Sequence, residues 1–377
     1  MRQLLKYELI KIFSRKSVFV VSLLLLLVYS LFIVSDIDYY EDGSQQYKPY
    51  ERVITEQDIA EVLKIFEEHE DRRAWPLVER GLLNDIWGAP MLQEKYTKQL
   101  AEIRDKLRLS APGSYEYKQH ALHEQLLTQK EPPSGQVYYN KPWANIVYII
   151  DQFGVAFMGV MILIGLAPLY SEEYATRMDS LLLSSRYGKG RLISAKCFAA
   201  IIYAFICSAA FQLFNLGVTA LLFGNLDGAG TPLYSISRYL DSYSFQSSPY
   251  SWTVGQYYVI QLGVHIIGCI AFALAVMFVS SLSKSSFLTL SIAGCILGVP
   301  YVLYDVFNIR IAITEWLATF SYSQFIRVTR LFTGFETVNI FHVPVLYTVA
   351  AVICVAAVTG VLVWATRRVF QRHQVTH

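Results

Sequence analysis

Three polar side chains stand within long apolar stretches of the chain, and each is of a type that could do chemistry. Asp151 lies near the start of the apolar stretch 146–170, and Gln261 and His265 lie one helical turn apart in the stretch 256–281. Polar side chains at such positions are costly in a membrane and usually serve a function. They could line a substrate path, or a neighbouring helix backbone could satisfy His265. One Asp and one His do not supply the paired groups of an intramembrane protease or acyltransferase, so we predict no catalytic residue.

Two other motifs suggest sites only at first sight. Glu116, His120 and His123 in "EYKQHALHE" have helical spacing, but no HExxH order or nearby cysteine accompanies them. We therefore predict a solvated helix face there rather than a metal site. The run "YGKGR" at 187–191 lacks the Gly-x-x-x-x-Gly-Lys-Ser/Thr pattern of a phosphate-binding loop. If the protein uses ATP, another polypeptide must bind it, and we predict that this chain binds no cofactor.

The composition is typical of a membrane protein. Hydrophobic residues make up 54% and charged residues 16% of the 377, whereas a soluble domain has about 25% charged residues. Six stretches contain the roughly 20 apolar residues that a membrane-spanning helix needs. These stretches lie at 18–35, 146–170, 195–223, 256–281, 285–304 and 343–366. We predict an all-α polytopic membrane protein with six transmembrane helices.

Lysine and arginine residues in the short loops predict the orientation of these spans. They gather before the first span, in the connection 171–194, at Lys284 and in the tail 367–377, whereas the loop 224–255 holds only Arg238. Cytoplasmic loops carry such an excess, so we predict that both termini are cytoplasmic in a multi-pass protein of the cell membrane. The net charge of +2 gives no polycationic surface for nucleic acid.

Two segments outside the spans are also predicted to be helical. Residues 1–17 carry an apolar face with most basic residues elsewhere, which predicts a cytoplasmic interfacial helix. That face is formed by Leu5, Leu9, Ile12 and Phe13. Residues 36–145 are polar, show helical periodicity and are broken at Pro and Gly residues, which predicts a mainly helical extracellular domain between spans one and two.

The connection 171–194 is charged but has three leucines at its centre. Read as a helix over 171–184, it places Tyr174, Met178, Leu181 and Leu182 on one face. Such a helix could lie on the lipid surface or dock into a groove on a soluble partner.

The run "YSEEYATRMDSLLLSSRYGKGRLISAK" at 170–196 resembles the same connection in ABC-2 type ABC transporter permeases, above all those of Gram-positive bacteria. The family has an acidic residue where a span ends, a Gly-Thr pair, a Leu-Leu-Ser run, a basic turn and a Lys that opens the next span. The matching positions are Glu172 or Glu173, Thr176, 181–184, Arg186, Lys189, Arg191 and Lys196. The usual Gly before the Thr is Ala175 in this chain.

The resemblance implies the permease subunit of a bacterial ABC exporter in the plasma membrane. Such a subunit is not an enzyme by itself: it pairs with a second permease, identical or different, and with two ATPase subunits that bind ATP and Mg²⁺. The resemblance also implies short re-entrant helices on the outer side over 305–342. The residues expected to couple to the ATPase are Glu172, Glu173, Thr176, Arg177, Leu181, Leu182 and Arg186.

The apolar character of the spans bears on the cargo of such an exporter, and other features allow two alternative functions. The apolar spans favour an amphipathic or hydrophobic cargo, such as an antimicrobial peptide, a drug or a lipid. One alternative is a membrane-embedded enzyme that uses His265 or Asp151. Another is a ligand-sensing membrane scaffold that uses the extracellular domain.

Overall fold

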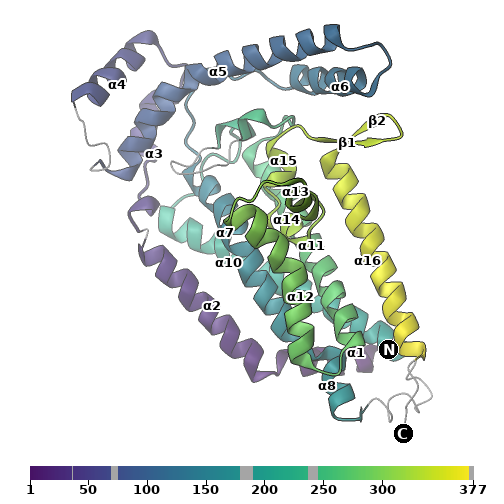
Figure 1. The fold of residues 1–377 in the computed structure, drawn as a ribbon. Coiled ribbons are helices and arrows are strands. Elements are labelled where there is room, and N and C mark those ends of the chain that lie inside the picture. The colour runs from purple at the N-terminus through teal and green to yellow at the C-terminus, as the bar shows by residue number, and fades with distance from the viewer. Residues whose placement is uncertain (36, 69–74, 179–189, 237–244, 373–377) are drawn as a thin grey trace.

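The computed structural model describes residues 1–35, 37–68, 75–178, 190–236 and 245–372. Within these residues, six helices are long and apolar enough to cross a membrane, in agreement with the predicted all-α polytopic fold with six spans (Figure 1). They are α2 (Lys16–Ser35), α7 (Lys141–Leu166), α10 (Arg191–Phe223), α11 (Val254–Leu282), α12 (Ser286–Tyr301) and α16 (Tyr347–Arg372). A π-helical turn, Val302–Val306, extends α12.

The remaining elements of the described residues are helices outside the six spans, 3-10 turns and one hairpin. The helices are α1 (Arg2–Phe13), α3 (Ser44–Tyr47), α4 (Glu56–Glu68), α5 (Leu77–Leu109), α6 (Tyr115–Gln129), α8 (Pro168–Ala175), α13 (Ala312–Thr319), α14 (Tyr322–Arg327) and α15 (Arg330–Thr333). Single 3-10 turns lie at Ile37–Tyr40, Lys48–Tyr50, Leu233–Ser235 and Phe245–Ser247. The antiparallel strands β1 (Thr337–Ile340) and β2 (Val343–Leu346) form the hairpin.

Hydrogen bonds at the first turns explain where several helices begin. Thr253 accepts from the Gln256 amide at the start of α11, and the Gln256 side chain accepts from the Thr253 amide, which makes a capping box. Ser285 caps α12 and Ser114 caps α6 in the simpler manner, each accepting one backbone N–H.

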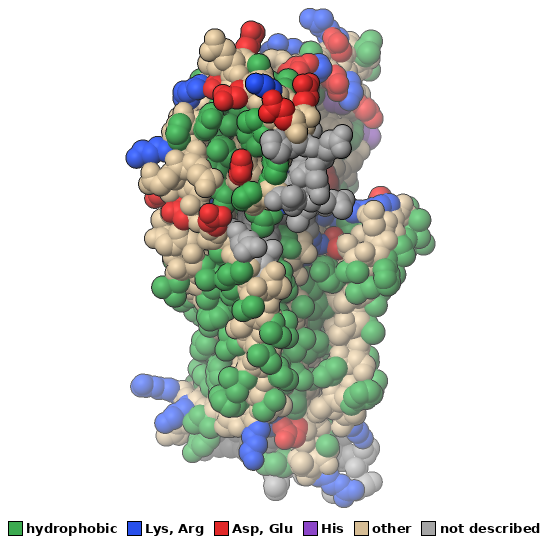
Figure 2. Space-filling view, turned by 90° about the vertical axis from the view of Figure 1, so that its left-hand side faces the viewer, with side chains coloured by type: hydrophobic (Ala, Val, Ile, Leu, Met, Phe, Trp, Pro, Cys, Tyr) green, Lys and Arg blue, Asp and Glu red, His purple; other side chains and the backbone are tan. Residues whose placement is uncertain are grey.

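The bundle is built around α7 and α11, which are largely buried, while α2, α12 and α16 expose most of their apolar residues. The short helix α14 packs into this core. Gly268 of α11 permits the contact, because a Cβ there would stand 2.8 Å from the Phe325 carbonyl carbon. Hydrophobic side chains cover the middle of the molecule and charged ones gather at its two ends, as a membrane protein requires (Figure 2).

Two element boundaries differ from the predicted ones. The second span was predicted at 146–170, and one candidate span of the structure, Lys141–Ala175, contains that stretch. Within it α7 ends at Leu166 and α8 begins at Pro168, because Pro168 has no N–H to donate. The last span was predicted from residue 343, but Val343–Leu346 is strand β2 and the helix begins at Tyr347. The four residues Val-Pro-Val-Leu at 343–346 are apolar and too few to show a strand periodicity, so the sequence does not separate them from the span that follows.

The described residues of 37–140, namely 37–68 and 75–140, form a helical unit at the far end of the bundle from the N-terminus, which we call the distal domain (Figure 1). Its small core includes Tyr47, Val62, Leu82 and Ile86. Helix α6 docks on the hairpin: Gln119 Nε2 donates to Thr337 Oγ1 at 2.8 Å. His123 stacks on Phe335 with ring centroids 4.0 Å apart. The prediction of a solvated face at His123 was therefore wrong.

Acid should loosen this docking. Burial lowers the pKa of His123 from 6.5 to about 4. Because the pKa of His123 is lower in the folded state, the unfolded state binds more protons between pH 4 and pH 6.5. The contribution of His123 to stability is therefore complete above pH 6.5 and is lost as pH falls towards 4. We expect a loss on the order of 2 kcal/mol for this partly exposed ring. Hydrogen exchange in α6 at pH 7 and pH 4.5 measures it. The substitution His123→Phe keeps the stacked ring and should abolish the acid effect; equal acid sensitivity in that variant would contradict the assignment.

Candidate functional site

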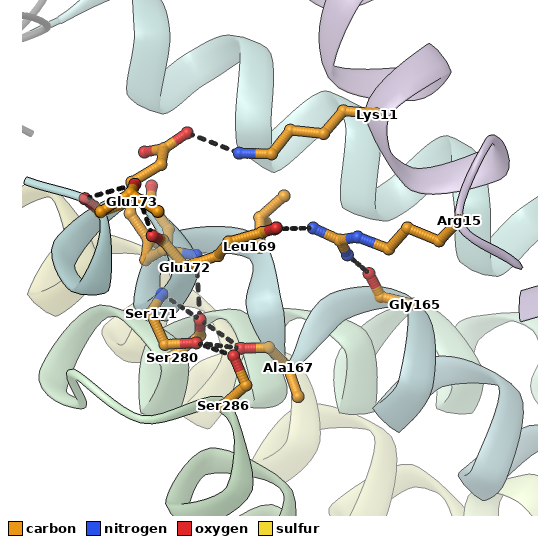
Figure 3. Close-up of polar contacts among 12 residues, drawn as sticks. Lys11, Arg15, Gly165, Ala167, Leu169, Ser171, Glu172, Glu173, Ser280 and Ser286 are labelled. Carbon is orange, nitrogen blue, oxygen red and sulfur yellow. Dashed lines mark hydrogen bonds and ion pairs between the residues drawn. The ribbon is translucent and has the colours of Figure 1, made fainter. Parts of the chain in front are cut away.

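The predicted coupling segment begins at the end of the bundle where α1, α8 and the start of α10 meet. We call this contact region the basal joint (Figures 1 and 3). Helix α1 turns Leu5, Leu9 and Ile12 onto the bundle core, and Ile12 is fully buried. These are three of the four residues that the periodicity of the sequence placed on one face.

Four charged residues from three helices form the centre of the basal joint. Lys196 Nζ of α10 donates to Glu173 Oε1 at 2.6 Å and to Glu8 Oε2 at 3.2 Å. Lys11 Nζ of α1 donates to the same Glu173 oxygen at 3.0 Å (Figure 3). Lys196 is fully buried and Glu173 is 4% exposed. The charges of the two acids and the two bases cancel. An uncompensated charge in a buried cluster would be strongly destabilising.

The break at Pro168 creates a second contact with the segment that links α1 to α2. Arg15 donates to the Gly165 carbonyl at 2.7 Å and to Glu172 Oε2 at 2.8 Å (Figure 3). In an unbroken helix that carbonyl would accept an amide four residues on. Arg15 thus holds both sides of the break between α7 and α8.

Hydroxyl groups join the basal joint to α11 and α12. Ser280 Oγ accepts the amides of Tyr170 and Ser171 at 3.0 and 3.3 Å and donates to the Ala167 carbonyl at 2.8 Å. Ser171 Oγ lies 2.8 Å from Ser286 Oγ (Figure 3). Helix α8 is therefore bonded to α1, α10, α11 and α12.

The predicted coupling residues fall in different places. Glu173 is buried in the cluster, whereas Glu172 has a half-exposed side chain paired with Arg15. Thr176 is exposed and follows the last residue of α8, and its hydroxyl donates to the Glu172 carbonyl at 2.8 Å. Arg177 follows with φ +58°, so α8 does not continue through 184 as one helix. Leu181, Leu182 and Arg186 lie outside the described residues.

Three residues of the basal joint have roles that the sequence does not predict: Glu8, Lys11 and Arg15. In the sequence, the two basic residues indicate only the orientation of the first span. Glu8 offered a signal: it is the single acid among the basic residues of 1–17, and it lies one helical turn from both Leu5 and Ile12 on the apolar face. An acid on that face needs a buried cation as its partner, which is Lys196 here.

The buried polar residues in the spans form a second group. His265 is fully buried, and its Nδ1 lies 2.6 Å from the Ile326 carbonyl oxygen of α14. This is the arrangement in which a neighbouring backbone satisfies the histidine. Both side-chain polar atoms of the fully buried Gln261 lack a hydrogen-bond partner within the described residues.

Asp151 pairs with Arg327, which lies 176 residues away in the sequence. Arg327 donates to Asp151 Oδ2 at 2.6 Å and to Oδ1 at 3.2 Å, and its remaining terminal nitrogen lies 2.6 Å from Asp305 Oδ1. The next residue, Val328, has φ +72°, a strained conformation for a β-branched residue. The ion cluster holds α14 against α7 and the turn after α12, and these contacts keep Val328 in its strained conformation.

Replacing His265 with Phe should affect stability rather than chemistry. The substitution keeps a ring next to Phe211 but leaves the buried Ile326 carbonyl without a partner, at a cost of about 1–3 kcal/mol. Thermal unfolding in detergent measures this loss. An active variant with a lowered unfolding temperature is expected, whereas complete loss of activity at unchanged stability would make His265 a functional residue.

No protein-family model matches this chain, and no curated protein matches it. Among the described residues, no group of three or more His, Cys, Asp or Glu side chains could hold a metal ion.

Proposed function

We propose that this chain is the membrane-spanning permease subunit of an ATP-driven ABC-2 type exporter. The observation that carries the proposal is the bonding of the basal joint. A partner that displaces α8 must also displace α1, α10, α11 and α12, because α8 shares ion pairs or hydroxyl hydrogen bonds with all four. Transmission of an ATP-driven motion into a bundle requires such a connection.

In this proposal the predicted coupling residues take two roles. Thr176, Arg177 and the half-exposed Glu172 contact the ATPase, together with Met178, which is 51% exposed. Glu173 is a positioning residue, since its side chain is turned into the bundle. Docked helices draw affinity from apolar anchors and register from charges, and this exposed set supplies both.

The proposed orientation puts the basal end in the cytoplasm of a bacterial cell. Lysine and arginine residues gather there in the space-filling view, whereas the distal end carries charges of both signs (Figure 2). The distal domain is then extracellular, and α1 lies at the cytoplasmic interface. A second permease and two ATPase subunits that bind ATP and Mg²⁺ complete the exporter.

An apolar cavity supports a hydrophobic or amphipathic cargo. It has a volume of about 490 Å³ and lies between α2 on one side and α7 and α10 on the other. Phe19, Leu25, Phe157, Met161 and Phe211 are among its lining residues. Apolar pockets of this size bind apolar ligands.

A ligand-sensing membrane scaffold is the second candidate function. It is favoured by the docking of α6 on the hairpin, because β2 leads directly into α16. A conformational change in the distal domain would therefore be transmitted through the hairpin to α16.

Site-specific photo-crosslinking distinguishes these two functions. A benzophenone amino acid at Met178 should crosslink to the ABC-type ATPase encoded nearest to this gene. The same group at Leu109, which is 88% exposed at the distal end, is the matched control and should not. Crosslinks at neither position, or at Leu109 alone, would contradict the exporter proposal.

A further inference from the structure

A cavity of about 360 Å³ lies where the distal domain meets the bundle. Three segments far apart in the sequence line it: residues 129–131 after α6, residues 230–234, and residues 250–256 at the start of α11. Ser251 Oγ donates to the Gln129 carbonyl at 3.3 Å, and Leu233 donates its amide to the Trp252 carbonyl at 2.9 Å. Contacts between the segments therefore form this cavity.

One wall of the cavity is aromatic and rigid. The rings of Tyr250 and Trp252 are stacked, with centroids 4.2 Å apart and planes at 11°. Both rings meet the edge of Phe332, and the Tyr250 hydroxyl lies 2.6 Å from Thr348 Oγ1 of α16. Flat, fixed aromatic surfaces of this kind hold apolar or aromatic groups at little entropic cost.

A buried cation lines the same cavity. Lys130 is 4% exposed, and its Nζ donates to the carbonyls of Gln246 and Ser248 at 3.1 and 3.2 Å and lies 5.4 Å from the Tyr234 ring centroid. These contacts use two of its three N–H groups. Within the part of the chain that the structure describes, no carboxylate pairs with it. A buried charge without a counter-ion is costly unless something neutralises it.

We propose that this cavity binds an organic carboxylate with an aromatic or apolar body. The third N–H of Lys130 would donate to one carboxylate oxygen, and the body would lie against Tyr250 and Trp252. A single available donor suits a carboxylate better than a phosphate, which presents three acceptor oxygens. The ligand would contact both the distal domain and α11, so its binding would stabilise their junction. This proposal does not depend on the exporter function.

The charge state of Lys130 gives the site a pH dependence. Burial lowers the pKa of Lys130 to about 8, so the ammonium loses its proton as pH rises through that value while a carboxylate stays ionised. Among the residues that the structure describes, the other titratable groups near the cavity are Glu131, Tyr234 and Tyr250, with Lys95 bonded to Gln246. Burial raises the pKa of both tyrosines, that of Tyr234 to about 12, so they remain neutral.

Fluorine NMR with two matched probes tests the proposal on the full-length protein in detergent. The probes are 3-(4-fluorophenyl)propanoate and its uncharged amide, with empty micelles as the blank. We expect protein-dependent line broadening for the acid and at least tenfold weaker binding for the amide. Binding of the acid should weaken at least tenfold between about pH 7 and about pH 9.5.

Variants complete this test. Lys130→Met and Trp252→Leu should each weaken binding of the acid about tenfold or more, by removing the cation or the wall. Lys118→Met, a lysine on the exposed surface of α6, is the control and should bind as the unmodified protein does. The proposal is overturned if the amide binds as well as the acid, if Lys130→Met binds normally, or if the acid does not bind at millimolar concentration. Because Trp252→Leu leaves the carbonyl contacts of Lys130 in place, it tests the site even if Lys130→Met fails to fold.

Discussion

Lys196→Met should lower the apparent free energy of unfolding by about 3–5 kcal/mol. The substitution removes the cation that Glu8 and Glu173 share and leaves Lys11 as the only base in the cluster. Removing one member of a buried ion pair has this effect because the remaining charge stays buried without compensation. Denaturation with sodium dodecyl sulfate in mixed micelles, followed by circular dichroism, measures the loss.

Lys284→Met is the matched control. Lys284 is an exposed lysine in the turn between α11 and α12, at the same end of the bundle, and its replacement should change stability by about 0.5 kcal/mol or less. Adding Glu173→Gln to Lys196→Met should recover part of the loss, since it removes the uncompensated carboxylate. Two results would show that the cluster does not hold the basal joint together. One is equal stability of Lys196→Met and Lys284→Met. The other is a double variant, Lys196→Met with Glu173→Gln, that is less stable than Lys196→Met by the full cost of Glu173→Gln alone.

The second large effect is expected at the other ion cluster. Arg327→Met should also cost about 3–5 kcal/mol, because it leaves both Asp151 and Asp305 without their shared cation. The loss should be local, since Arg327 is the last residue of α14 and holds that short helix between α7 and the turn after α12. Hydrogen exchange over 320–332 should therefore rise by more than exchange in α10.

A surface arginine in the same region gives the control for this prediction. Arg310 is exposed, and its Cζ lies 3.7 Å from the Tyr304 ring centroid. Arg310→Met should therefore lower the free energy of unfolding by about 1 kcal/mol or less. Asp151→Asn in the Arg327→Met background should restore part of the stability. Exchange that rises equally over the whole bundle in Arg327→Met would show that the cluster supports global stability and not the local packing of α14.

The sequence predicts the spans because length and hydropathy determine which helices can cross a membrane. Stretches such as 18–35 leave no other structure that satisfies the backbone in lipid. Periodicity also assigns Leu5, Leu9 and Ile12 of α1 to one face, but the sequence indicates a membrane interface for that face and does not predict that it packs on the bundle core. These features depend on local sequence, so they can be found before any partner in the fold is known.

The candidate site depends on pairings between residues far apart in the sequence. Asp151 could be identified as a costly group in an apolar stretch, but nothing near it in the sequence indicates Arg327. In the same way, Glu173 seemed available to a partner protein because its neighbours are polar, and only the packing of α1 and α10 shows it to be buried. Pro168 is visible in the sequence, but the change from α7 to α8 within the span Lys141–Ala175 is seen only in the structure.

The central test of the exporter proposal is ATP hydrolysis by the chain together with an ATPase partner. The chain is purified in lipid nanodiscs with the ABC-type ATPase encoded nearest to its gene, and ATP hydrolysis is compared with that of the ATPase alone. If the chain is an exporter permease, we expect a stable complex with several-fold faster hydrolysis, and loss of that stimulation in Lys196→Met at a temperature where the variant stays folded. Failure of the two proteins to co-purify, together with an unchanged hydrolysis rate, would contradict it.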